Sequence, residues 1–163
     1  MRGLRIAGIV GGLLLAGGGV PAPARGPAPG AARDPGGCSS AQLDVRLDRV
    51  DPGAGNRYAP LVFTNRSGAD CTLRGRPALV VLDASGAPLP GAAPAAPGTW
   101  APEETVTLEP GGSARSVLHW TVTADDCPDA SALLVTPPGQ GAATTLPFPA
   151  GRVCGTLDVT PVR

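Results

Sequence analysis

The only histidine of the chain, His119, is the residue best suited to acid–base chemistry. A hydrolase built on serine, histidine and an acid needs a serine beside the histidine, often on a G-x-S-x-G turn, and the sequence has no such turn. Ser116 lies three residues before His119 on an expected strand, so the two side chains point to opposite faces. Glu103 and Glu104 are loop neighbours, not two acids converging on a cleft. We therefore predict no catalytic residue and interpret His119 as a solvent-facing strand residue.

Acidic residues cluster around Cys127 in the stretch ADDCPDA, which contains Asp125, Asp126 and Asp129. Several carboxylates from one loop are the ligands that calcium prefers. Aspartate is also a standard turn residue, and the spacing is not that of an EF-hand, so a solvated loop is the preferred interpretation and calcium the alternative. A copper site needs two histidines and a free cysteine, and the chain has one histidine. We predict no metal site and no other cofactor.

Two aromatic residues are the candidate ligand-binding residues, Tyr58 in GNRYAP and Trp100 in PGTWAPEE. Both are expected at the ends of strands or in loops, where β-sandwiches display binding surfaces. The alternative, that each ring packs under a loop and caps the core, is the commoner arrangement in a chain with so few aromatic residues.

Four cysteines, Cys38, Cys71, Cys127 and Cys154, indicate two disulfides if the chain is exported. Three connectivities are possible. We favour Cys38 with Cys71 and Cys127 with Cys154, because sequential pairing closes loops of moderate length, each worth about 3–4 kcal/mol in the loop-entropy model. A structural zinc site is the competing interpretation and is disfavoured, because no C-x-x-C pair occurs.

Short runs of alternating or apolar residues predict the strands that position these groups. The segment 43–50 places Leu43, Val45 and Leu47 on one face. Turn chemistry is expected at 51–56, and the three consecutive apolar residues 61–63 are typical of a strand covered on both faces.

The longest expected strand covers 113–123 and directs Trp120 into the core and His119 away from it. Further runs at 71–74, 78–83 and 105–108, a strand–turn–strand unit over 133–148 and a last run at 156–162 complete the pattern. A type I turn is expected at 83–86, a type II turn at 109–112 and a long surface loop at 88–102. With no amphipathic segment of helix length, eight or nine short strands predict an all-β, antiparallel β-sandwich.

The N-terminal segment has the pattern of an export signal. Arg2 and Arg5 precede an apolar stretch, 6–20, and Ala22-Pro23-Ala24 offers a small-x-small cleavage site, with an earlier cut near Ala16 as the alternative. We predict a signal peptide at 1–24, a flexible linker rich in proline, alanine and glycine at 25–37, and one domain at 38–163. Because Gly18 stands where a lipoprotein would carry its acceptor cysteine, we expect a secreted, extracellular protein.

Charge argues against a polyanionic partner. All 13 basic residues are arginine, and without Arg2 and Arg5 the remaining 11 face 13 acidic residues, a formal net charge of about −2. Nucleic acids and anionic membranes recruit a basic excess, so neither is an expected partner. No apolar stretch after the signal is long enough to span a membrane.

Several motifs follow one another along the chain: Cys38, GAGNRYAPLVFTN (53–65), CTLRG (71–75), LEPGGSA (108–114), LHW (118–120), VTPPG (135–139) and Cys154. Their order resembles a family of exported and lipid-anchored actinobacterial domains. It is the domain-of-unknown-function family numbered four-two-three-two. The resemblance covers nearly all of Cys38 to Val162 and implies an immunoglobulin-like extracytoplasmic domain, without any established catalytic or binding residue to transfer. This chain departs from the lipid-anchored members because it lacks the acceptor cysteine.

Together these features predict a non-catalytic binding or structural module that acts at the cell envelope or in the medium. The expected partner is an extracellular or envelope protein or a glycan. A secreted enzyme is the alternative, and a protease inhibitor that presents the loop 88–102 is a further one.

Overall fold

The computed structural model describes residues 35–89, 102–124, 126–139, 141–149 and 151–163. The contacts divide the chain into two units, Met1–Arg33 and Asp34–Arg163, and the second unit is described below. The expected signal peptide, most of the expected linker, Trp100 and Asp125 lie outside the described residues. No helix among the described residues has the length and hydropathy needed to cross a membrane.

The described part of the chain contains ten strands and one 3-10 turn, η1 (Ser40–Gln42). The strands are β1 (Leu43–Leu47), β2 (Asp51–Gly53), β3 (Asn56–Asn65), β4 (Cys71–Arg74), β5 (Ala78–Leu82), β6 (Thr105–Leu108), β7 (Ser113–Thr121), β8 (Ala132–Thr136), β9 (Thr144–Pro147) and β10 (Cys154–Val159).

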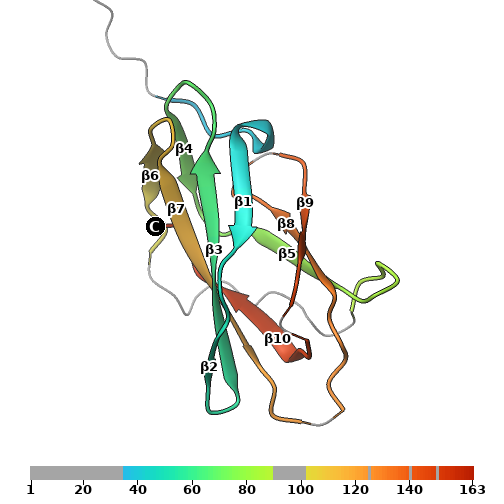
Figure 1. Ribbon diagram of the computed structural model, residues 1–163. Coiled ribbons are helices and arrows are strands. Elements are labelled where there is room, and N and C mark those ends of the chain that lie inside the picture. Colours follow the sequence, from blue (N-terminus) through green and yellow to red (C-terminus); the bar gives the residue numbers. More distant parts are fainter. Residues whose placement is uncertain (1–34, 90–101, 125, 140, 150) are drawn as a thin grey trace, which may run out of the picture. The chain divides into compact units, whose positions relative to one another are not determined.

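All strand pairs are antiparallel. The largest sheet has the order β1-β3-β7-β10, with β2 also paired to β3. Two smaller sheets, β4-β6 and β5-β8-β9, lie against it (Figure 1). The three sheets share one core, to which β3 contributes Phe63, β4 Leu73 and β8 Leu133. The predicted all-β antiparallel sandwich is therefore confirmed.

Alternation along β7 decides which side chains fill this core. Ala114, Ser116, Leu118 and Trp120 are buried, whereas the residues between them reach the outer face of the sheet, as predicted. On β3 the prediction of a strand covered on both faces is also confirmed, because Leu61, Val62 and Phe63 are all buried. Residues 61 and 63 belong to the core cluster and Val62 does not.

The turn predicted over 51–56 is partly wrong. Residues 51–53 form β2, which pairs with the first residues of β3, and only Ala54 and Gly55 form the loop. Both loop residues have positive φ, 43° and 86°, which is the conformation of a tight hairpin turn whose twist matches that of its strands. This extra strand brings the number to ten.

The two other turns have the predicted chemistry. Gly112 donates its N–H to the carbonyl of Glu109 at 2.8 Å, and Gly111 has the positive φ, 80°, that a type II turn requires. Gly86 donates to the carbonyl of Asp83 at 3.1 Å in the other turn. A hydrogen bond from the Ser85 hydroxyl lowers the pKa of the Asp83 carboxyl.

Both expected disulfides are present, Cys38–Cys71 and Cys127–Cys154. The first is buried and ties the segment before β1 to the start of β4. The second is partly exposed and ties the β7–β8 connection to the start of β10.

Candidate functional site

The outer face of the large sheet carries a cluster of side chains from three neighbouring strands. Tyr58 on β3 lies directly opposite His119 on β7, and Asp158 on β10 lies opposite His119 on the other side. Asn56 and Val117 are two residues away from this row on β3 and β7 and therefore share its face. We call these five residues the outer patch.

His119 is the centre of the outer patch. Its Nε2 lies 2.8 Å from Asn56 Oδ1, its Nδ1 lies 3.4 Å from Asp158 Oδ2, and its ring stacks on Tyr58 with 4.7 Å between centroids. His119 lies on the outer face of the sheet, as predicted, but its side chain is only 23% exposed because cross-strand neighbours cover much of its ring. The imidazole is held in place from three sides.

Tyr58 and Val117 are the exposed members of the outer patch. The exposed fraction is 43% for Tyr58 and 39% for Val117, which are among the few large apolar side chains of the described residues left in solvent. Tyr58 therefore does not cap the core, since it lies on the outer side of a sheet whose other side fills the core. The second candidate ligand residue, Trp100, lies outside the described residues.

His119 and Asp158 are the residue types that form the histidine–acid pair of a catalytic triad, but their surroundings differ from those of such a pair. A histidine that acts as a general base needs one ring nitrogen free to take a proton from the substrate. Here both nitrogens face side-chain oxygens of the protein. Ser116 is fully buried on the opposite side of the sheet, as its sequence position predicts. The histidine ring therefore stacks on Tyr58 and has no serine beside it in the described part of the chain.

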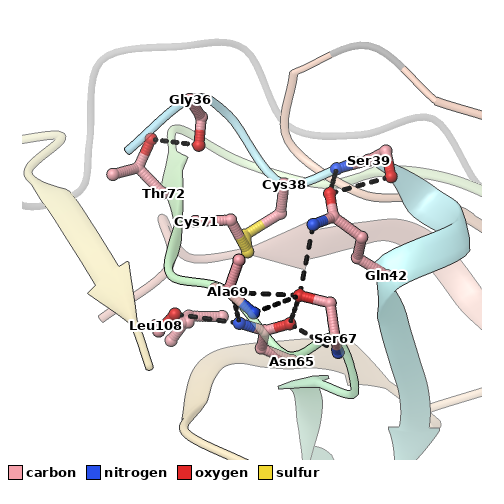
Figure 2. Close-up of a disulfide and its surroundings, with 10 residues drawn as sticks. All are labelled: Gly36, Cys38, Ser39, Gln42, Asn65, Ser67, Ala69, Cys71, Thr72 and Leu108. Carbon is pink, nitrogen blue, oxygen red and sulfur yellow. Dashed lines mark hydrogen bonds between the residues drawn. A yellow bond between two sulfur atoms is a disulfide. The ribbon is translucent and has the colours of Figure 1, made fainter. Parts of the chain in front are cut away.

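A second polar cluster lies beside the Cys38–Cys71 disulfide (Figure 2). Asn65 is fully buried, and its amide nitrogen donates to the carbonyls of Ala69 and Leu108 at 2.8 and 3.0 Å. Its Oδ1 accepts from the backbone N–H and the hydroxyl of Ser67. The segment Asn65-Arg66-Ser67 thus begins a turn, and the side-chain amide of Asn65 is fully hydrogen-bonded within the protein.

Hollows elsewhere on the domain are open to solvent. One of about 450 Å³ lies over Asn65, Ser67 and Gly111, and another of about 370 Å³ lies beside Cys38 and Arg74. The polar atoms of Asn65 that border the first hollow are already hydrogen-bonded within the protein. Asn65 therefore offers few unsatisfied polar atoms to a ligand in this hollow.

The aspartate cluster near Cys127 is only partly described. Asp126 and Asp129 are exposed, and Asp125 lies outside the described residues. Among the residues with described positions, no group of three or more histidine, cysteine, aspartate or glutamate side chains could hold a metal ion. Of the expected surface loop 88–102, the structure describes Pro88, Leu89 and Pro102.

Comparison with known families gives a match over the whole sandwich. A family model described as domain of unknown function (DUF4232) matches residues 38–163. The chain belongs to this family. The DUF4232 match begins at Cys38, the first cysteine of the buried disulfide, and includes all ten strands and the outer patch. No curated protein and no solved structure matches the chain.

Proposed function

We propose that the domain is a non-catalytic extracytoplasmic binding module whose recognition surface is the outer patch. Its partner is an envelope or extracellular protein or a glycan. The two disulfides and the export pattern of the N-terminal segment support a location outside the cytoplasm.

The observation that carries the proposal is an exposed tyrosine held in one orientation. Tyr58 stacks on His119, whose ring is in turn fixed by Asn56 and Asp158. Tyrosine is enriched at energetically important interface positions because its ring buries apolar area and its hydroxyl can still hydrogen-bond. A ring that is already oriented loses little conformational entropy on binding.

The surroundings of Tyr58 fit a partner that has both apolar and polar surface. Val117 adds an exposed apolar contact on the neighbouring strand, and the polar groups of Asn56 and Asp158 flank the rings. Interfaces commonly combine an aromatic anchor with a polar rim of this kind.

The proposal is tested by capture from cell-wall and culture-medium fractions of the producing organism, using the immobilised chain with both disulfides oxidised. Tyr58→Ala is compared with Val80→Ala, which truncates a similarly exposed apolar residue, 37% exposed, on the β5-β8-β9 sheet. We expect Tyr58→Ala to weaken binding of the captured component by roughly ten-fold or more, as for interface anchors, and Val80→Ala to leave it unchanged. Equal binding by both variants would contradict the proposal.

A further inference from the structure

One edge of β1 pairs with β3, and no strand in the described part of the chain pairs with its other edge. Asp48 donates its N–H to Pro60, and Arg66 donates to Gln42, both at 2.7 Å. In an antiparallel ladder the residues that bond to the partner strand alternate, so residues 42, 44, 46 and 48 direct their backbone groups toward β3. The backbone N–H and C=O groups of Val45 and Leu47 therefore lie in the plane of the sheet and point away from β3, toward the open edge.

Two of the other sheet edges, those of β4 and β9, are blocked. The segment before β1 covers β4, because Thr72 donates to Gly36 and Cys38 donates to Thr72. On β9, Pro147 has no donor to offer at the free side. β1 carries no proline and pairs with β3 in unbroken register over its whole length. Such an edge is a template for strand addition.

The charged residues of β1 determine which added strand would pair favourably with its open edge. Its sequence, LDVRL, places Asp44 and Arg46 on the outer face, one on each side of Val45. In an antiparallel pair centred on Val45, Asp44 of each copy lies opposite Arg46 of the other. The strand is thus complementary in charge to a second copy of itself, and opposite charges facing each other across strands stabilise pairing.

We propose that the chain forms a two-fold homodimer by antiparallel pairing of β1 with β1 of a second copy. The two Val45 residues exchange backbone hydrogen bonds, and each Leu47 N–H donates to the carbonyl of Leu43 in the other copy. The N–H of Leu43 already donates to the carbonyl of Ser40 in its own chain, so it makes no hydrogen bond to the second copy. The result is one continuous sheet across the two copies.

The surface around β1 is compatible with this contact. A hollow of about 260 Å³ beside the edge is lined by Arg46 and by five apolar residues, which leave apolar surface to bury next to the paired strands; the five are Val45, Leu47, Leu146, Pro147 and Pro149. The exposed ion pairs Arg46–Asp48 and Asp44–Arg66 lie on the same face, and the facing charges would extend them into a network. Exposed pairs of this kind contribute more to register and specificity than to affinity.

The dimer would also place two outer patches on the same side of the continuous sheet, because the two-fold axis runs perpendicular to it. Two linked patches bind a repetitive surface more tightly than one. This consequence rests on the proposed function, whereas the dimer itself does not.

The test is sedimentation velocity of the oxidised full-length chain over concentrations that reach several hundred micromolar. It compares the unmodified chain with Asp44→Arg, with the charge swap Asp44→Arg/Arg46→Asp, and with Glu109→Arg, which makes the same charge change in an exposed turn. We expect the unmodified chain and Glu109→Arg to form dimers alike. Asp44→Arg should raise the dimer dissociation constant roughly ten-fold, because each attractive pair becomes repulsive, and the swap should restore dimerisation.

A monomer at every concentration would overturn the proposal, as would a dimer that is insensitive to Asp44→Arg or is not restored by the swap. The measurement uses no ligand, so its outcome is independent of whether the outer patch binds a partner.

Discussion

At the scale of single residues, Asn65 and Ser116 are the polar residues buried in the described part of the domain, and their surroundings differ. Asn65 makes hydrogen bonds through both ends of its amide. Ser116 Oγ has no hydrogen-bond partner among the residues with described positions. A buried polar group stabilises a fold only when its hydrogen bonds are satisfied.

Replacing Asn65 by alanine should destabilise the domain by about 2–4 kcal/mol, since it leaves the Leu108 carbonyl and other buried groups without partners. Asn56→Ala is the matched control, because Asn56 is only partly buried, and should cost less than about 1 kcal/mol. Chemical denaturation gives both values. Equal costs would show that the Asn65 hydrogen bonds contribute little.

Ser116→Ala should have the opposite effect. It removes a buried hydroxyl that has no partner in the described part of the chain, so it should raise the free energy of unfolding by about 0.5–2 kcal/mol. The same denaturation experiment checks this expectation. A loss of stability would mean that the hydroxyl has a favourable interaction, such as one with a buried water molecule.

Phe63→Ala tests the packing of β3 against the other sheets. Phe63 is fully buried in the shared core, so truncation should cost about 3–5 kcal/mol. Thermal or chemical unfolding measures the loss. Stability close to that of the unmodified domain would contradict the core assignment.

At the scale of elements, the two disulfides close loops of similar length, with separations of 33 and 27 residues, but differ in burial. The loop-entropy contribution is therefore nearly equal, about 3–4 kcal/mol each. Cys38 and Cys71 are 5% and 2% exposed, so serine replacements there also bury two hydroxyl groups. Cys38→Ser/Cys71→Ser should thus destabilise the domain by about 1–2 kcal/mol more than Cys127→Ser/Cys154→Ser. Denaturation of the two double variants makes the comparison, and a reversed order would refute it.

Much of this element structure is local and was predictable from the sequence. The alternation of 113–121 placed Trp120 in the core, and the residues of the turn at 109–112 predicted its type. The hairpin of β2 was missed because its three residues, DPG, have turn composition and become a strand only through pairing with β3. Tertiary pairing overrides such weak local preference.

At the scale of the whole molecule, the functional interpretation depends on register between distant strands. Tyr58 was identified as a candidate from the sequence, but its stacking on His119, which in turn contacts Asp158, joins three strands separated by long stretches of chain. No local pattern encodes that juxtaposition. The role of Asn65 was missed for the same reason, since its partner Leu108 is 43 residues away.

The central claim is that a partner binds the outer patch, and the composition of the chain allows a direct test. The chain has one tyrosine and one histidine, so the aromatic proton NMR signals of Tyr58 and His119 each report on one known position. We would record these signals while adding the captured envelope component to the oxidised chain. The account predicts that both signals shift or broaden in step with binding, while those of the buried Trp120 change little. Binding that leaves the Tyr58 and His119 signals unchanged would place the recognition surface elsewhere and contradict the account.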